Sequence, residues 1–139
     1  MTLIAPHRNG FKLGTNSYVE TQGKTGMYFD IFIAAENEYF ELKDDEKEIA
    51  IIVIEGKGEI EFQGHTINFD RPNWIDCDPT VVHMSPGENV KIRSITPSRF
   101  SIIKTENNEK FKGKIYSPND IDTEHRGKGL AKWTRKNII

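Results

Sequence analysis

The sequence predicts an all-β fold, built as a single antiparallel sandwich or barrel. Apolar residues mostly alternate with polar ones in short segments, and turn residues separate these segments about every ten positions. Helical periodicity is nearly absent. A chain of 139 residues has the usual length of one domain and is long enough to bury a core. We therefore expect one domain over residues 1–139.

The first two strands are expected at residues 27–33 and 49–54. In the first, alternation predicts one buried face made of every second residue: Met27, Phe29, Ile31 and Ile33. The second, Ile-Ala-Ile-Ile-Val-Ile, has no polar face at all. Such a run predicts a central strand that is covered on both sides.

The next expected feature is a hairpin after the turn at Gly56 and Gly58. Residues 59–62 and 65–69 alternate on either side of Gln63-Gly64, a pair that can close a two-residue turn. Further strands are expected at residues 90–95 and 100–104, on either side of the break at Thr96-Pro97, and a last strand pair at residues 111–116. The apolar faces of these strands predict the core: Ile51, Val53, Ile60, Phe62, Ile67 and Ile92.

Two segments differ in charge from the rest of the chain. Residues 118–139 are rich in lysine and arginine and carry no acidic residue after Glu124. We expect them to form an extended arm on the surface or on a neighbouring subunit. Residues 36–48 hold seven acidic residues against two lysines, which favours a solvated loop. Alternatively, the arm and the loop meet between subunits, where opposite charges set orientation.

Composition excludes several classes of function. A net charge of −2 gives no general attraction to nucleic acids, and no apolar run approaches the length of a membrane span or a signal peptide. The only cysteine, Cys77, cannot form an internal disulfide, so a reducing compartment, the cytoplasm, is expected. Its neighbours Asp76 and Asp78 disfavour a thiolate, so it is no candidate nucleophile.

The order of these elements resembles cupin barrels, in which a buried strand precedes Gly-x-Gly, a hairpin and a Pro-x-x-x-His segment, here Pro79 to His83. Metal-binding cupins use two histidines one residue apart, a glutamate a few positions later and a further histidine. The resemblance implies that Glu48 and His83 occupy the last two positions. Leu42 and Lys43 stand where the histidine pair is needed. A divalent ion would keep two protein ligands, or three if Asp44 turns inward, so no cofactor is expected.

A more specific resemblance lies near the end of the chain. The segment from Glu124 to Lys128, Glu-His-Arg-Gly-Lys, and the later residues 134–138 resemble the 5-deoxy-glucuronate isomerases of myo-inositol breakdown and the related 5-keto-4-deoxyuronate isomerases. Members of that family have two cupin halves and carry their metal ligands in the second. This chain resembles the first half, so no catalytic residue of the family is carried over to it.

Five residues are candidates for a ligand site. Arg71, Trp74 and Arg93 are the residue types that bind a sugar acid, because guanidinium pairs with carboxylate and indole stacks on a sugar ring, although Trp74 could equally be core. His83 is favoured as a packed histidine over a metal ligand. Glu48 either points into the barrel as an acid or base, or, as we favour, caps the edge of the acidic loop.

The sequence therefore predicts a cupin-like, non-catalytic subunit that binds a small sugar acid or has a structural role. The alternative is an aldose–ketose isomerase, active as an oligomer or with a partner chain. A homodimer or larger homo-oligomer is expected, because the second half of the two-half proteins would cover surface that this half leaves open. Apolar residues of the arm also favour assembly: Leu130, Trp133, Ile138 and Ile139.

Overall fold

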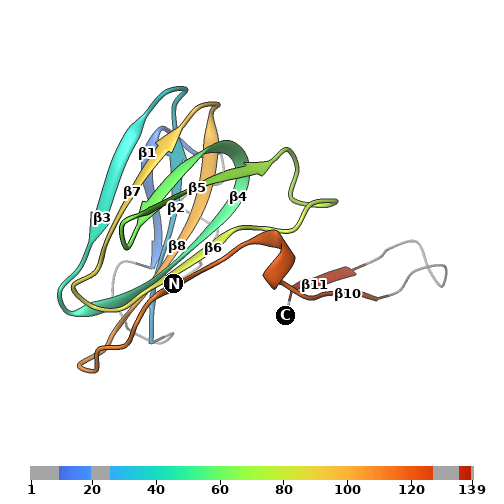
Figure 1. Ribbon diagram of the computed structural model, residues 1–139. Coiled ribbons are helices and arrows are strands. Elements are labelled where there is room, and N and C mark those ends of the chain that lie inside the picture. The colour runs from blue at the N-terminus through green and yellow to red at the C-terminus, as the bar shows by residue number, and fades with distance from the viewer. Residues whose placement is uncertain (1–9, 20–25, 127–134, 139) are drawn as a thin grey trace.

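A computed structural model describes residues 10–19, 26–126 and 135–138 of the chain. Their regular structure is almost entirely β (Figure 1), which confirms the predicted fold class. The elements in chain order are β1 (Gly14–Val19), β2 (Tyr28–Ala34), β3 (Tyr39–Lys43), β4 (Lys47–Phe62), β5 (His65–Arg71), β6 (Val81–Met84), β7 (Asn89–Ser94), β8 (Ser98–Glu106), β9 (Lys114–Tyr116), the 3-10 turn η2 (Pro118–Asp120), β10 (Thr123–Arg126) and β11 (Arg135–Ile138). Among the described residues, no helix has the length and apolar character needed to cross a bilayer.

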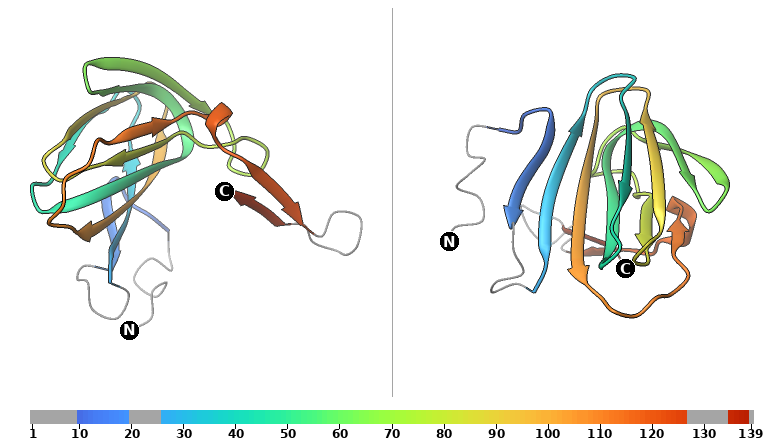
Figure 2. Two further views of the ribbon diagram at one scale, coloured as in Figure 1. Left: turned by 60° about the horizontal axis from the view of Figure 1, so that its bottom comes forward. Right: turned by 90° about the vertical axis from the view of Figure 1, so that its left-hand side faces the viewer.

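The strands form two antiparallel sheets that share β4. The first sheet has the order β1-β2-β8-β4-β6-β9, and the second has the order β3-β7-β4-β5. The two sheets face each other, as the two views in Figure 2 show, and one apolar core lies between them. The pair β10 and β11 forms a separate hairpin that extends from the barrel, so the segment expected as an extended arm contains paired strands.

Strand β4 changes sheets partway along its 16 residues. Its first part pairs with β6 and β8, and its second part with β5 and β7. A bulge between Val53 and Glu55 adds one residue to the strand. Val53 and Gly58 lie an odd number of positions apart, and in a regular strand such residues face opposite sides of the sheet. The extra residue of the bulge lets both face the core.

Gly56, directly after the bulge, has a backbone conformation that favours glycine. Its φ is +132°, and a Cβ atom there would collide with the side chain of Ser98. Gly58 is also required, because a Cβ atom at that position would meet the backbone of Arg93 and the ring of Phe69. The Gly-Lys-Gly segment therefore permits the bend and the close approach of neighbouring strands.

The core contains the residues predicted for it. Ile51, Val53, Ile60, Phe62 and Ile92 are buried, and Ile67 packs against them from a partly buried position. Aromatic rings connect the two sheets through successive contacts, with centroid distances of 4.4 Å for Phe32–Phe40, 5.3 Å for Phe40–Phe100 and 5.7 Å for Phe100–Phe69.

The predicted buried face of β2 is wrong. The core residues Phe100 and Ile102 of β8 lie opposite Phe32 and Asp30, so the core face of β2 carries Tyr28, Asp30, Phe32 and Ala34. Of the predicted set, Phe29, Ile31 and Ile33 lie on the outer face of the first sheet, where Ile31 is nevertheless buried, and Met27 is exposed. Alternation identified the strand, but its pairing with β8 decides which face meets the core.

Two further expectations need correction. Residues 36–48, expected as a solvated loop, contain β3, from which Phe40 and Leu42 pack against the core. The outer face of β4, expected to be covered, is only half-buried by the described residues at Ala50, Ile52 and Ile54. The first sheet therefore has an outer face that is apolar around these three residues.

Replacement of a core isoleucine tests the assignment of faces in β4. Ile60→Ala should lower the free energy of unfolding by about 2–4 kcal/mol, because a fully buried side chain leaves a cavity. Ile54→Ala, on the half-buried outer face, should cost about 1 kcal/mol or less. Urea unfolding measures both, and equal losses would mean that the two faces are misassigned.

The bend in β4 is tested at Gly56. Gly56→Ala should lower the free energy of unfolding by about 2–4 kcal/mol, because backbone strain adds to the collision with Ser98. The control is Gly64→Ala in the β4–β5 turn, where φ is also positive but a Cβ atom meets open space, so about 1 kcal/mol is expected. A loss at Gly56 no larger than that at Gly64 would contradict the close approach.

Candidate functional site

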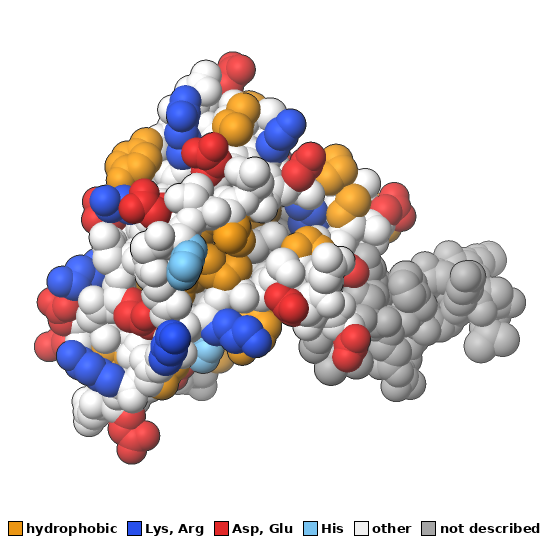
Figure 3. Space-filling view, viewed as in Figure 1, with side chains coloured by type: hydrophobic (Ala, Val, Ile, Leu, Met, Phe, Trp, Pro, Cys, Tyr) orange, Lys and Arg blue, Asp and Glu red, His pale blue; other side chains and the backbone are white. Residues whose placement is uncertain are grey.

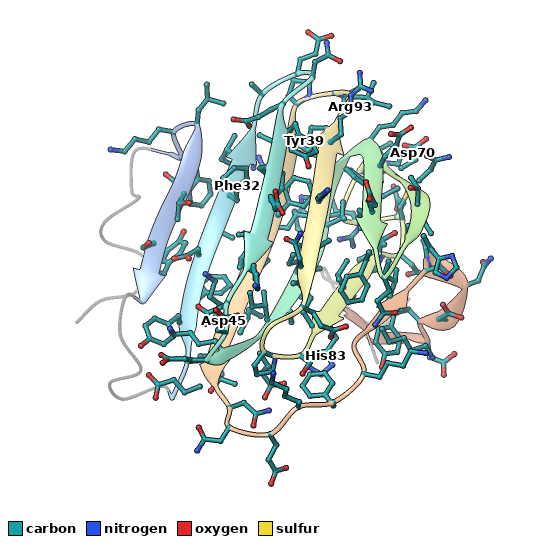
Figure 4. The ribbon with its side chains drawn as sticks, turned by 60° about the vertical axis from the view of Figure 1, so that its left-hand side comes forward. Phe32, Tyr39, Asp45, Asp70, His83 and Arg93 are labelled. Carbon is teal, nitrogen blue, oxygen red and sulfur yellow. The ribbon has the colours of Figure 1, made fainter. Side chains whose placement is uncertain are left out.

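Glu48 and His83 form a pair on the outer face of the first sheet. The Nε2 atom of His83 lies 2.9 Å from Oε2 of Glu48, and the side chains are 41% and 28% exposed. The imidazole also packs against the ring of Phe111, with the centroids 4.7 Å apart. Figure 4 shows His83 at the lower end of the barrel. Because its partner His83 lies on the outer face, the side chain of Glu48 does not point into the barrel.

The residues next in sequence to this pair occupy the interior instead. Ile49 and Met84 lie directly opposite each other on β4 and β6, and both are fully buried. Phe40 and Leu42 of β3 face the same core. Because side chains alternate along a strand, a shift of one residue separates the polar pair from the interior. The barrel interior at these positions is apolar.

Asp44, considered as a third ligand if it turned inward, closes the turn between β3 and β4. Its Oδ1 accepts hydrogen bonds from the backbone N–H groups of Glu46 (2.9 Å) and Lys47 (3.0 Å), and its Oδ2 lies 3.5 Å from Nζ of Lys47. Burial alone would raise the pKa of this carboxyl, but these hydrogen bonds and the charge of Lys47 outweigh it and lower the pKa. Among the described residues, no three His, Cys, Asp or Glu side chains gather as a metal donor set.

Arg71 is a buried residue that holds the bend of β4. Its side chain donates to three carbonyl oxygens, those of Val53 (2.8 Å), Cys77 (2.9 Å) and Trp74 (3.1 Å), and the residue is 5% exposed. Burial lowers the pKa of the guanidinium, while the nearby Cys77 and Asp78 oppose that shift. Each of its nitrogens is therefore already engaged in joining the loop at residues 72–80 to the bulge in β4.

Trp74 and Arg93 do not converge with the guanidinium of Arg71. Trp74 lies in the loop after β5 and is 59% exposed. Arg93 lies on the outer face of the second sheet, opposite Tyr39 and Glu59, whereas Arg71 faces the core. Figure 4 shows Arg93 and Tyr39 at the end of the barrel opposite to His83. The five sequence-based candidates thus do not form one site. Glu48 and His83 have side chains in contact, Arg71 bonds to the backbone of Trp74, and Arg93 lies apart from both pairs.

A groove that these candidates do not include lies between β5 and the segment leading into β9. We call it the β5–β9 groove. It has a volume of about 480 Å³. Figure 3 shows apolar side chains exposed at the centre of this face, bordered by histidine and by basic side chains. Its lining consists of Phe62, Gln63, His65, Ile67, Lys112, Gly113, Lys114 and Ile115.

A hydrogen-bond network around Glu88 fixes one wall of the groove. Oε1 of Glu88 accepts from the backbone N–H groups of Ser85 (2.8 Å) and Gly113 (2.9 Å). The side-chain amide of Gln63 donates to Oε2 of Glu88 (2.9 Å) and to the carbonyl of Gly113 (2.8 Å). The β4–β5 turn is thereby joined to the segment before β9. A side chain at Gly113 would collide with Glu88 and with the backbone of His83.

Sequence reasoning missed this groove because its residues come from two distant segments. The available signal was the Lys-Gly-Lys sequence before Ile115, which places two cations at the start of a short strand. Nothing in the sequence alone indicates that this strand lies across from β5.

Two solved structures of about twice this length resemble the fold over 86% of the chain. One is an IolB-like protein from Salmonella typhimurium LT2, with 17% identity, a TM-score of 0.71 and 47% of its own chain covered. The other is a putative glyoxylate induced protein from Pseudomonas aeruginosa, with 16% identity, a TM-score of 0.61 and 46% of its chain covered. The chain thus spans about half the length of these relatives.

A shorter solved structure is covered over almost its whole length. The Cupin_2 domain of an XRE family transcriptional regulator from Enterobacter cloacae has 14% identity, a TM-score of 0.53 and 96% of its chain covered, against 68% of this one. These likenesses establish a cupin-type β-sandwich. No curated protein matches the chain. The model of the KduI/IolB family matches residues 3–139, nearly the whole sequence, and the chain therefore belongs to the KduI/IolB family.

Proposed function

We propose that this cupin-like chain binds a small sugar acid or acts as a structural subunit, and performs no catalysis by itself. The observation that carries this proposal is the apolar barrel interior, where Ile49 faces Met84 and both are fully buried. A dedicated metal site needs three or four oxygen, nitrogen or sulfur ligands, and these positions offer none.

The chemistry of aldose–ketose isomerisation supports the same conclusion. The reaction requires a base and an electrophile placed at adjacent carbons of the substrate. His83 and Glu48 face outward and bond to each other, and the guanidinium of Arg71 donates to three backbone carbonyls. None of these groups is directed toward a cavity inside the barrel.

The second candidate function is a sugar-acid isomerase in which another chain, or another copy, supplies the missing groups. One observation favours it: the chain spans 47% of the IolB-like protein of Salmonella typhimurium, so the similar structure contains as much sequence again. In such an assembly this chain would hold the partner in place and contribute no ligand from its own interior.

The proposed function predicts binding without metal. The purified protein should carry no stoichiometric transition metal, and D-glucuronate should cause saturable amide shifts in NMR spectra that are unchanged after treatment with EDTA, because no ion bridges ligand and protein. Plasma emission spectrometry measures the metal. One equivalent of zinc, manganese, iron or nickel, lost again in His83→Ala, would refute the proposal, as would glucuronate shifts that EDTA abolishes.

We further propose that the chain self-associates through the outer face of its first sheet. Ala50 and Ile52 of β4 lie beside Ile103 of β8 and Val81 of β6 on that face, and all four are only half-buried by the described residues. An apolar surface of this kind is commonly covered by a second subunit. The predicted contribution of the arm rests on side chains that lie outside the described residues.

Light scattering tests this assembly. The intact chain should be a dimer or larger, and Ile52→Asp should shift it toward monomer by at least tenfold in dissociation constant, because a carboxylate would be buried against the partner. Tyr39→Asp, on the outer face of the second sheet, is the matched control and should leave assembly unchanged. A chain ending at Thr123 tests the arm separately. A monomeric intact chain, or equal effects of the two aspartates, would exclude the first sheet as the interface.

A further inference from the structure

The β5–β9 groove lies between two sheet edges. Among the described strands, β5 pairs only with β4, and β9 pairs only with β6. The two sheets separate here, and the apolar side chains of Phe62, Ile67 and Ile115 form the floor between them. A groove of about 480 Å³ is within the size range of small-molecule sites.

The rim of the groove is positively charged. Lys112, Lys114 and His65 are exposed, and of the described residues that line the groove none is acidic. Neither lysine forms an ion pair with another described residue. The ammonium of Lys114 lies 4.9 Å from the centroid of the Tyr116 ring, a contact that leaves its hydrogen-bond donors available.

Among the described residues, the two carboxylates near this rim, those of Glu88 and Asp120, form no ion pair with its lysines. Glu88 accepts hydrogen bonds from the backbone of Ser85 and Gly113 and from the amide of Gln63. Asp120 accepts from the backbone N–H and the hydroxyl of Ser117, both at 2.9 Å, and these bonds, together with Lys114, lower its pKa. Both carboxylates are thus occupied by groups of the protein's own turns.

We propose that the β5–β9 groove binds a small carboxylate with one apolar face, such as the ring face of a sugar acid. The carboxylate pairs with Lys112 and Lys114 at the rim, and the ring packs on Ile67 and Ile115. The groove would thus be the binding site for the ligand of the proposed function. The inference rests on that function only for the identity of the ligand as a sugar acid. A small ligand fits better than an added peptide strand, because β9 has three residues and begins with a lysine, and charged short edges oppose strand addition.

The test uses NMR titration of the full chain with two probes, D-glucuronate and cyclohexanecarboxylate. Both should shift the amides of His65, Ile67 and Gly113. The double variant Lys112→Ala/Lys114→Ala should weaken binding at least tenfold. The control Lys43→Ala/Lys57→Ala removes the same charge from exposed lysines that do not line the groove, and should change affinity less than twofold. Thermal unfolding verifies that both variants fold.

The outcomes separate the inference from the proposed function. If glucuronate binds but shifts other amides, or if both double variants weaken its binding equally, the groove is not the binding site. Sugar-acid binding itself is then retained. If cyclohexanecarboxylate occupies the groove and glucuronate does not bind, the groove is a carboxylate site, and the proposal that its ligand is a sugar acid is refuted. If neither probe binds, both are refuted. Strand-mediated aggregation of the Lys112/Lys114 variant with unchanged affinity would show that these lysines protect the edge and would overturn the groove assignment.

Discussion

The bend of β4 is the feature on which the remaining structure depends. One strand contributes Ile49 and Val53 to the first sheet and Ile60 to the second, and these residues reach the same core only because the bulge adds one residue between them. A bulge leaves backbone groups without their ladder partners. Here Thr80 accepts from the N–H of Val53, and Arg71 donates to its carbonyl. Apolar packing of two sheets therefore relies on one buried cation.

Alternation along the chain predicted most strands and the core, because each strand of an antiparallel sandwich has a period of two residues. It could not predict which face of a strand is buried when both faces are apolar or mixed. In β2 the core face carries Asp30 and Phe32 because β8 presents Ile102 and Phe100 to them. Around β3 the many acidic residues of the segment 36–48 masked the alternation of Phe40 and Leu42, and a loop was therefore expected.

The candidate residues show the same limit. Glu48 and His83 were chosen from their spacing, and each is one residue away from an interior position. On a helix a shift of one residue turns the side chain by about 100°, but on a strand it turns the side chain to the opposite side of the sheet. The Lys-Gly-Lys signal alone could not locate the β5–β9 groove, because its two walls come from distant segments that strand pairing and the network of Glu88 with Gln63 and Gly113 bring together.

The three carbonyl contacts of Arg71 also affect how the barrel fluctuates. They connect the backbone of β4 at Val53 with the following loop at Trp74 and Cys77. Loops usually open independently of the strands that they join, at a small cost in free energy. In this protein, release of the loop would remove the donor for the carbonyl of Val53 inside the barrel, so we expect residues 72–80 and the β4 bend to open together. Amide hydrogens in both places should then exchange with similar protection, and one side chain, that of Arg71, would set its level.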